Sequence, residues 1–370
     1  MRHFFLVISV LLLASLFSIL PSLELDQRTR DFTNVPSIDD RKALQATAFV
    51  FGPVVHIVVT RFMQHQPTLV ELGSARLALF RAFCLPTMIQ QSNQNFLWVI
   101  QTDPHLDSTL MQEMVSLLQP HSHFFLLLSN DNGQNFRRQA VNESLVASGD
   151  VALLSQARKL SEDHIFIETR IDADDGINLR LLQNIQHVSI QRLSNPPVNS
   201  ASRWLVFCID RHFEWHNADE SPEGVLVLVS EAICVTPGLS FAMAPEVSRD
   251  SLPKGAHNRL VYKASTCKTQ NETACIYRMY QIHRAAAIRA RTTTSAGMAN
   301  IGKTFEKNSS TKLFWDAASI DLGIDKGDVI NAKAYLDVRK VDIARENLDG
   351  QWYVKFRIYC DLLLMNSLPS

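Results

Sequence analysis

The stretch His164–Ile177, HIFIETRIDADDGI, decides the fold. Its alternating apolar residues predict a β-strand. The strand ends abruptly in three acids, Asp172, Asp174 and Asp175, and Gly176 then permits a sharp turn. In open α/β sheets, ligands bind beyond the carboxyl ends of the strands, which is where these acids are expected to lie.

The acidic cluster predicts a metal site. Three carboxylates so close together repel one another and need a counter-charge. A hard divalent cation, Mn²⁺ or Mg²⁺, accepts carboxylate oxygens and shares its other positions with phosphates. The spacing excludes an EF-hand loop, because Gly176 is the fifth residue rather than the sixth and Gln183 stands at the twelfth. A solvated acidic turn is the alternative.

Around this stretch, apolar runs of strand length alternate with helical patterns. Strands are predicted at His56–Phe62, Asn95–Thr102, His123–Asn130, Arg203–Asp210 and Gly224–Val235. Helices are predicted from Leu72 to Pro86, where the proline should end the helix, and at Leu106–Leu118, Val151–Leu160, Ala274–Ala290 and Val329–Asn347. The alternation predicts an α/β fold with a mostly parallel sheet and right-handed crossovers, and with a more mixed second half.

The N-terminal segment 4–23 is apolar and uncharged, follows Arg2, and precedes the first acid, Glu24. It just reaches the length of about 20 residues that crosses a bilayer. Arg2 predicts a cytosolic N-terminus, and hence a single-pass type II protein with a lumenal body in the Golgi or another secretory-pathway membrane. A cleaved signal peptide and a secreted protein are the alternative. The expected organisation is a cytosolic tail (1–3), a signal anchor (4–23), a stem (24–50), a catalytic domain (51–325) and a C-terminal helical extension (326–370).

Composition narrows the partners and the compartment. The 370 residues carry a net charge of −1, with 36 basic and 37 acidic residues, so no basic field exists to hold nucleic acid. Six cysteines fit an oxidising lumen. Cys267 and Cys275, in a polar segment, are the predicted disulfide, whereas Cys84, Cys208 and Cys234 lie in apolar runs and are predicted to be buried thiols. Three N-glycosylation sequons agree with a lumenal chain, at Asn142, Asn271 and Asn308.

Four separated blocks carry a more specific resemblance. They are HIVVTRF (His56–Phe62), FCLPTMIQQSNQNFLWVIQTDP (Phe83–Pro104), TRIDADDG (Thr169–Gly176) and RTTTSAGM (Arg291–Met298). In this order they resemble the rhamnosyltransferase family among the GT-A glycosyltransferases, over Val55–Met298. The resemblance implies a GT-A-like, Rossmann-type nucleotide-diphospho-sugar transferase fold, with a mostly parallel central sheet and a mixed acceptor-side half.

The resemblance also implies roles for the acids. Asp172 and Asp174 would form the DxD element and bind a divalent metal that bridges the diphosphate of a nucleotide-sugar donor. Asp175 would support them and is a candidate catalytic group. The leaving diphosphate gains negative charge as the glycosidic bond breaks, and a metal ion stabilises that charge. No covalent cofactor is required.

Further residues are implied in the nucleotide-sugar site. Thr60, Arg61 and Asp103, at strand ends, match positions where GT-A enzymes contact the nucleotide. Arg138, or its neighbour Arg137, could reach the diphosphate as a fork-shaped donor. An ordinary surface charge is an equally good explanation of each.

The second half offers a metal ligand and a base. His257 is the candidate for the later histidine that GT-A metals often take, and a solvated loop histidine is its alternative. An inverting transfer needs a general base near the acceptor hydroxyl. The acids available for it are Asp210, Glu214, Asp219 and Glu231. Sequence alone does not distinguish them, and Glu231 is our candidate.

One segment suggests a different enzyme. Gly297–Thr304, GMANIGKT, fits the P-loop pattern at every specified position. A P-loop must follow a buried strand, whereas the preceding IRARTTTSA is basic and rich in threonine, so we take the match as a coincidence. The prediction is a metal-assisted glycosyltransferase that moves a sugar, rhamnose by the family's name, from a nucleotide-sugar to a glycan or glycoconjugate hydroxyl. The alternatives are a P-loop nucleotide-dependent enzyme and a non-catalytic lumenal carbohydrate-binding protein.

Overall fold

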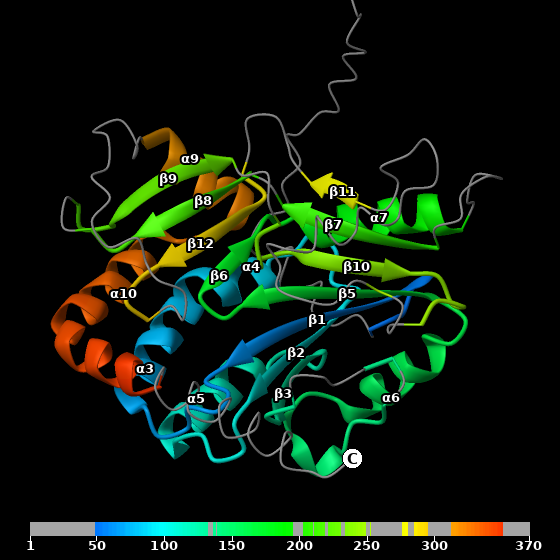
Figure 1. Ribbon diagram of the computed structural model, residues 1–370, viewed down its shortest axis with the longest axis horizontal. Coiled ribbons are helices and arrows are strands. Elements are labelled where there is room, and N and C mark those ends of the chain that lie inside the picture. Colours follow the sequence, from blue (N-terminus) through cyan, green and yellow to red (C-terminus); the bar gives the residue numbers. More distant parts are fainter. Residues whose placement is uncertain are drawn as a thin grey trace, which may run out of the picture. The chain divides into compact units, whose positions relative to one another are not determined.

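A computed structural model of the chain is built around an eight-stranded sheet (Figure 1). Its strands lie in the order β11 (Ile276–Met279), β7 (Trp204–Ile209), β10 (Leu239–Met243), β5 (Ile165–Asp172), β1 (Val54–Phe62), β2 (Leu97–Thr102), β3 (Phe124–Leu128) and β4 (Val146–Ser148). β10 runs antiparallel to β5 and β7, and β4 to β3, whereas the other neighbours are parallel. The expected α/β class is confirmed, with its mostly parallel sheet and mixed second half.

The structure describes residues 49–131, 136–137, 139–194, 203–209, 211–218, 221–230, 234–248, 252, 276–279, 285–294 and 312–350. All of them belong to one unit of the chain, which begins at Phe49. The predicted tail and anchor, and all but the last two residues of the predicted stem, lie outside the described residues.

A second, four-stranded sheet follows directly from the acidic stretch. Its strands lie in the order β6 (Asp175–Ile177), β12 (Ala287–Arg291), β8 (Arg211–His216) and β9 (Val225–Ser230). Only two residues separate the end of β5 from the start of β6, so the acidic turn joins the two sheets (Figure 1). Trp215 anchors the small sheet, because its ring packs 5.1 Å from that of Phe83 on the helical side.

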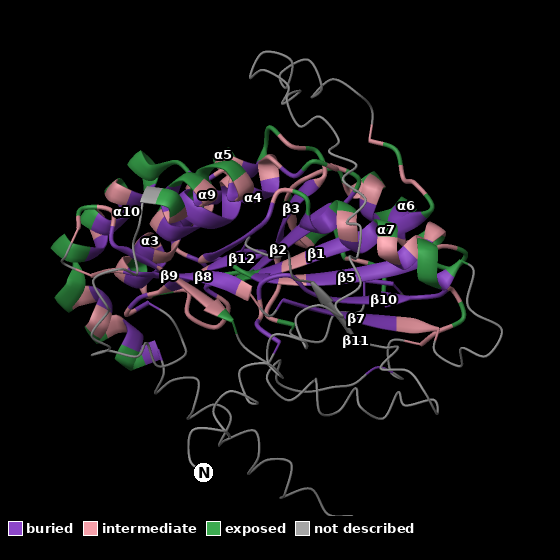
Figure 2. Ribbon diagram, turned by 90° about the horizontal axis from the view of Figure 1, so that it is seen from above, coloured by how far each residue is buried: buried purple, intermediate pink, exposed green. Residues whose placement is uncertain are grey.

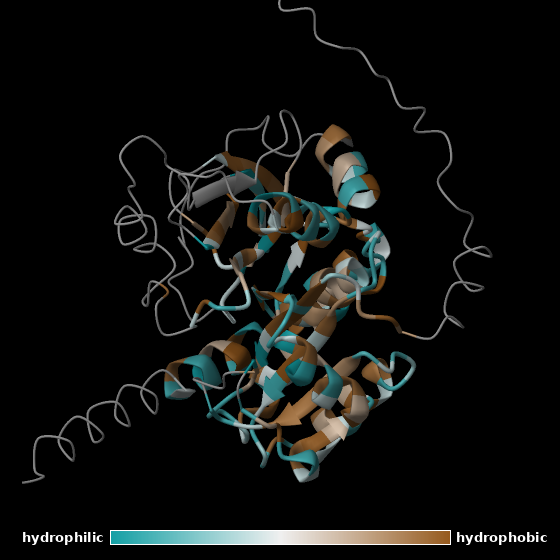
Figure 3. Ribbon diagram, turned by 90° about the vertical axis from the view of Figure 1, so that its right-hand side faces the viewer, coloured by the Kyte–Doolittle hydropathy of each residue, from teal (hydrophilic) through white to brown (hydrophobic). Residues whose placement is uncertain are grey.

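The helices form two hydrophobic cores of unequal size. The larger core contains α3 (Val70–Leu79), the π turn η2 (Phe80–Cys84), α4 (Leu85–Ile89), α5 (Ser108–Leu118), α7 (Leu181–Leu193), α9 (Lys312–Leu322) and α10 (Lys326–Val338). The smaller core, on the other face of the sheet, contains α6 (Val151–Leu160), and the short 3-10 helix η3 (Glu143–Leu145) lies just before β4. Buried residues line the strands in Figure 2, and the same strands are largely hydrophobic in Figure 3.

Side-chain caps explain where several helices begin. Asp107, Asp150 and Asp325 each accept hydrogen bonds from backbone N–H groups in the first turn of α5, α6 and α10. The helix that begins at Val70 does not end at Pro86, as the sequence analysis predicted. The π turn η2 precedes the proline, and the widened turn accommodates the ring and the missing N–H, so the helix continues to Ile89.

Two other helix predictions need correction. The predicted helix Ala274–Ala290 is wrong, because this segment contains β11 and the start of β12. In β12 the residues Ile288 and Ala290 face the core, and Arg289 and Arg291 alternate with them, as the period of a strand requires. The predicted helix Val329–Asn347 is interrupted at Arg339, between α10 and a helix at residues 340–350.

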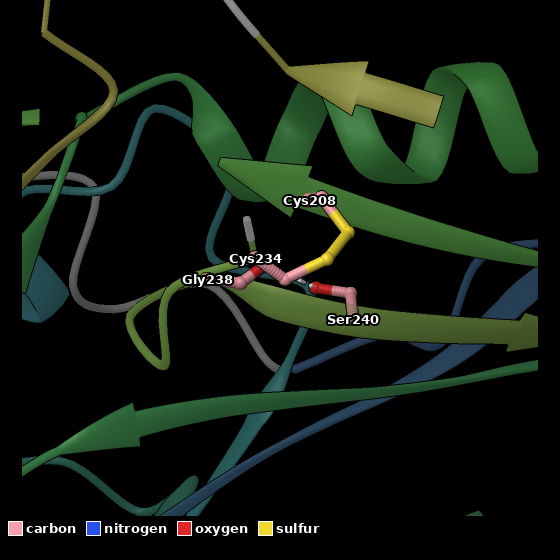
Figure 4. The surroundings of a disulfide bond; sticks show 4 residues. All are labelled: Cys208, Cys234, Gly238 and Ser240. Atoms are coloured by element: carbon pink, nitrogen blue, oxygen red, sulfur yellow. Dashed lines mark hydrogen bonds between the residues drawn. A yellow bond between two sulfur atoms is a disulfide. The ribbon is translucent and has the colours of Figure 1, made fainter. Parts of the chain in front are cut away.

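The disulfide prediction also changes. Cys208 on β7 and Cys234, before β10, form a disulfide with a Cα–Cα distance of 4.9 Å, so their assignment as thiols was wrong (Figure 4). Apolar flanks cannot reveal such a pair, because buried thiols and buried disulfides share them. Cys84 is a buried free thiol, as predicted. Cys267 and Cys275 lie outside the described residues.

One helical stretch of the described chain, Val70–Ile89, is long and apolar enough to cross a membrane, with a mean hydropathy of 1.3. It is 67% buried within the fold. Its residues, such as Leu72 and Phe83, belong to the larger core, which accounts for the apolar composition.

Candidate active site

The strand order reverses between β1 and β5, and a ligand crevice is expected at this place. The chain runs outward from β1 to β2 and β3 on one side, and then returns to place β5 on the other side of β1. Parallel sheets bind ligands outside the carboxyl ends of the strands at such a reversal point. Arg61 near the end of β1 and Asp172 at the end of β5 are register partners at this place.

The acidic turn divides its three carboxylates between two environments. Asp172 is exposed and Asp174 is half-buried, while Ala173 between them is buried and anchors the turn. Asp175 is buried in β6, and its Oδ1 accepts a hydrogen bond from the backbone N–H of Ala290 (3.2 Å). Asp172 and Asp174 are therefore the pair that a ligand at the crevice would meet.

The pKa of Asp175 is raised well above its ordinary value. Burial is the largest cause, and the charges of Asp174 and Asp172 add to it, whereas Arg289 and the hydrogen bond from Ala290 act in the opposite direction. This carboxyl stabilises the β6–β12 pair, which fits the supporting role implied for it.

Gly176 allows the acidic turn to pack closely against the helical side. A Cβ at this position would lie 2.8 Å from Thr87 Cγ2 and 2.9 Å from the backbone oxygen of Phe83. The glycine is needed for this close approach to η2 and α4, in addition to the turn for which the sequence suggested it.

Arg76 on α3 is a site residue that the sequence analysis missed. Its guanidinium donates to Thr294 O (3.3 and 3.0 Å), to Gln66 Oε1 (2.7 Å) and to Met63 Sδ (3.2 Å). Burial lowers its pKa, and the nearby carboxylates of the acidic turn partly offset this. A positively charged arginine thus lies behind the acidic turn. Its isolated position in an apolar helix gave no sequence signal.

The residues predicted to contact the nucleotide have different environments. Arg61 is exposed beside Asp172. Thr60 is fully buried, and its hydroxyl accepts a hydrogen bond from the indole Nε1 of Trp98 (2.9 Å). A nucleotide could therefore meet the backbone of Thr60 but not its hydroxyl.

Asp103 connects the loops that follow β2 and β3. Its Oδ1 accepts from the backbone N–H of His105 (2.9 Å), and its Oδ2 accepts from Asn130 Nδ2 (2.6 Å). Asn130 in turn accepts from the backbone N–H of His65 (3.1 Å). Met63 and His65 adopt φ values of 50° and 61°, in the left-handed region that non-glycine residues rarely occupy. Such strain concentrates at functional sites and agrees with a binding role for this rim.

The structure does not support the prediction that Arg137 or Arg138 binds the diphosphate. Arg137 is buried and donates to the backbone carbonyls of Ser161, Ala244, Pro245 and Val247, so it does not reach the crevice. Arg138 lies outside the described residues. The same holds for the candidate ligand His257, the candidate base Glu231, the P-loop match Gly297–Thr304, and the acids Asp210 and Asp219.

A charged cluster occupies one face of the small sheet. Glu214 on β8 accepts a hydrogen bond from Arg291 Nε (2.7 Å), and its other oxygen lies 3.5 Å from His216 Nε2. His212 Nε2 and Arg289 Nη1 are each 3.9 Å from Glu214 Oε1. The register aligns Asp175, Arg289 and Glu214 in one row across three strands. The row connects the acidic turn to the small sheet.

Glu214 is poorly suited to be a base. Burial alone would raise the pKa of its carboxyl, but the nearby His212 and His216, together with the hydrogen bond from Arg291 and its charge, hold the pKa well below its usual range. A carboxylate that releases its proton so readily is a weak acceptor for the proton of a hydroxyl.

The acidic pair could hold a metal only with help from its substrate. Across the ranges that the structure describes, no three side chains of His, Cys, Asp and Glu are gathered so that they could hold a metal ion. Asp172 and Asp174 offer two carboxylates, and a Mg²⁺-like ion commonly takes one or two carboxylates and fills its other positions with water and phosphate oxygens. The donor set thus fits a metal bound together with a diphosphate.

No curated protein matches the sequence. Among solved structures, the chain is similar to "Crystal structure of S. aureus TarS" at 14% identity and a TM-score of 0.31, covering 64% of this chain and 36% of that one. This chain thus spans about a third of the length of that protein, and so low a similarity supports no functional statement.

The family comparison covers the site directly. The model of the family described as "Putative rhamnosyl transferase" matches residues 72–276. This range contains Asp172, Asp174 and Asp175, and it makes up more than half of the chain. The chain therefore belongs to this family of glycosyltransferases.

Proposed function

We propose that this chain is a metal-dependent GT-A glycosyltransferase of the secretory pathway. It moves a sugar from a nucleotide-sugar donor to a hydroxyl of a glycan or glycoconjugate. Rhamnose is the sugar we propose, on the family's description. With a β-linked nucleotide-rhamnose, an α-linked product would require inversion.

One observation carries the proposal. Asp172 and Asp174 lie at the carboxyl end of β5, at the reversal point of the sheet beside Arg61. The topology supports binding at this position, and two carboxylates there suit a divalent metal that also holds a diphosphate.

The residues of the site divide the chemistry among them. When bound, Mn²⁺ or Mg²⁺ would stabilise the charge that develops on the leaving diphosphate. Asp172 and Asp174 would hold it, and Arg61 lies beside them to meet the nucleotide or its phosphates. The acceptor hydroxyl must lose a proton as its oxygen bonds to the sugar carbon. Glu231 remains our candidate for that base.

The disulfide supports the proposed compartment. The Cys208–Cys234 bond is buried between β7 and the segment before β10. Disulfides persist in oxidising compartments and are rare in the cytosol of most organisms. We therefore propose a lumenal catalytic domain, held in the Golgi or a neighbouring membrane by residues 4–23, with secretion after cleavage as the alternative.

The test is nucleotide release by the full-length chain, purified in detergent, from a panel of UDP-, dTDP- and GDP-sugars. Release from one donor in the presence of Mn²⁺, lost with a chelator and in Asp174→Ala, is the expected result. If nucleotide release is unchanged by the chelator and by Asp174→Ala, the acidic-site mechanism is refuted. If glycan binds but no donor is consumed with any acceptor, the protein is instead a carbohydrate-binding protein.

A further inference from the structure

Arg289 is a largely buried arginine whose guanidinium has no close hydrogen-bond partner among the described residues. Its side chain is 14% exposed. Within the described part of the chain it makes no hydrogen bond, and its one ion pair is the long contact of 3.9 Å to Glu214 Oε1. Its register partner Asp175 directs Oδ1 to the backbone N–H of Ala290 instead.

Arg291, two residues further along β12 and on the same face, provides a direct comparison. Its Nε and Nη2 each lie 2.7 Å from Glu214 Oε1. Glu214 is therefore paired mainly with Arg291. The charge of Arg289 acts on Asp175 across the strands, but the N–H donors of its guanidinium have no hydrogen-bond partner among the described residues. A guanidinium removed from water without a close partner costs free energy, which an anion supplied by a ligand would offset.

The position of Arg289 indicates which anion this is. Asp175, directly across from Arg289 on the adjacent strand, follows the acidic turn without a break. Neighbouring strands are about 4.8 Å apart, so the arginine side chain can reach a ligand held at that turn. A guanidinium presents its N–H donors as a planar fork that matches two phosphate oxygens.

We propose that Arg289 binds the distal phosphate of the nucleoside diphosphate, and that Glu214 positions the small-sheet arginines rather than acting as the base. The inference rests on the proposed function, since it deepens the account of the same site. During transfer the bond between the sugar carbon and the distal phosphate oxygen breaks, and its electron pair stays on that oxygen. The acceptor oxygen bonds to the carbon and gives its proton to the general base, for which Glu231 is our candidate. Arg289 stabilises the charge gained by the phosphate.

Stability separates this role from a structural one. The full-length chain is compared as wild type, Arg289→Met and Arg291→Met, and their thermal unfolding midpoints are measured without nucleotide. We expect Arg289→Met to keep or raise the midpoint, because it removes a buried cation that lacks a close partner. Arg291→Met should lower the midpoint, because it leaves Glu214 buried without its closest partner. A loss of midpoint in Arg289→Met as large as in Arg291→Met would overturn the proposal.

Binding tests the ligand. Titration calorimetry with Mn²⁺ compares UDP, dTDP or GDP, whichever binds the wild type, with the matching monophosphate. In Arg289→Met the diphosphate should bind about 10- to 100-fold more weakly, since a hydrogen bond to a charged group is being removed, while the monophosphate affinity is unchanged. Arg289→Lys keeps the positive charge but loses the planar fork of N–H donors. Its affinity for the diphosphate should lie between those of the wild type and Arg289→Met.

The remaining outcomes are decisive as well. Unchanged diphosphate affinity in Arg289→Met, or equal weakening of diphosphate and monophosphate, would overturn the assignment. Arg203→Gln, which removes an arginine paired with Glu246 on the surface, controls for charge alone and should bind both nucleotides as the wild type does. A wild-type chain that binds no nucleoside diphosphate would instead refute the proposed function.

Discussion

The guanidinium of Arg76 and the backbone carbonyl of Thr294 are joined by two hydrogen bonds, 3.3 Å from Nε and 3.0 Å from Nη2. Through them α3 holds the turn that follows β12, although 218 positions separate the two residues. The same guanidinium binds Gln66, in the loop after β1. One arginine thus fixes two of the loops that surround the acidic turn.

Arg76→Gln is expected to lower the free energy of unfolding by about 2–4 kcal/mol, because the buried carbonyl of Thr294 and the amide of Gln66 lose their partner. Urea denaturation at neutral pH would measure the change. Arg81→Gln is the matched control, since Arg81 lies further along the same helical stretch and pairs with Glu113 at the surface. The control should change stability by no more than about 0.5 kcal/mol. Equal effects of the two substitutions would contradict the role assigned to Arg76.

Strands that are apolar throughout could be recognised from the sequence. β1, β2, β3 and β5 are buried on both faces and appear as continuous or alternating apolar runs, so their positions were predicted closely. β8, RHFEWH, escaped prediction because its polar residues line the cluster around Glu214 while Phe213 and Trp215 face the core. Polar and apolar residues do alternate along β8, as in a strand. Its charged and polar residues, however, are also typical of a loop.

The candidate site shows the same division. Asp172 and Asp174 could be proposed from the sequence because they follow a strand directly in the chain. Arg289 was not, because its significance depends on pairing with Asp175 across 114 positions and on Glu214 being occupied by Arg291. Pairings between strands so far apart follow from the folded topology, and short sequence motifs do not encode them.

Asp174→Asn is expected to remove the response to metal while stabilising the protein without metal. Asp172 and Asp175 lie close to Asp174, and removing one negative charge reduces their mutual repulsion. The thermal unfolding midpoint of the metal-free protein should rise by about 1–3 °C. In the wild type, Mn²⁺ with a nucleoside diphosphate should raise the midpoint further, and this second increase should be absent in Asp174→Asn. Asp163→Asn, in an exposed turn, should leave both values unchanged. A full metal response in Asp174→Asn would contradict the metal role.

Gly176→Ala is expected to destabilise the fold by about 1–3 kcal/mol. The added methyl group would overlap the backbone oxygen of Phe83 at 2.9 Å, and a helical backbone cannot move as a side chain can. Chemical denaturation would measure the change. Gly52→Ala is the control, because nothing lies within 4 Å of the position its Cβ would take. Equal stability of both variants would show that the acidic turn packs less closely.

Removing the Cys208–Cys234 disulfide should lower the free energy of unfolding by about 3 kcal/mol, because the bond closes a loop of 26 residues and so restricts the unfolded chain. The double substitution Cys208→Ala and Cys234→Ala, compared with the wild type under non-reducing conditions, measures this. Peptide mapping without reduction should recover the two cysteines linked to each other. Linkage of either one to a different cysteine would contradict the structure.

His56 predicts how stability depends on acid. Its ring lies fully buried in β1, where Nε2 hydrogen-bonds Thr169 Oγ1 (2.8 Å) and Nδ1 meets Gln186 Nε2 (3.1 Å). Burial lowers its pKa from 6.5 to about 3. Between these values the unfolded chain binds a proton that the folded chain does not, so stability is lost as the pH falls below 6.5.

The loss attributable to His56 should approach about 1.4 kcal/mol for each pH unit within that window. Urea denaturation at pH 7.5, 5.5 and 4.5 would measure it as the difference between the wild type and His56→Gln, whose amide can keep hydrogen bonds without titrating. The difference is informative because His123, with a pKa lowered to about 4 by burial and by His121, adds its own slope to both proteins. His187→Gln, at an exposed position on α7, should retain the wild-type slope. If His56→Gln shows the same dependence of stability on pH as the wild type, the prediction is wrong. The ring of His56 would then take up a proton in the folded protein, and its burial beside Gln186 would be incomplete.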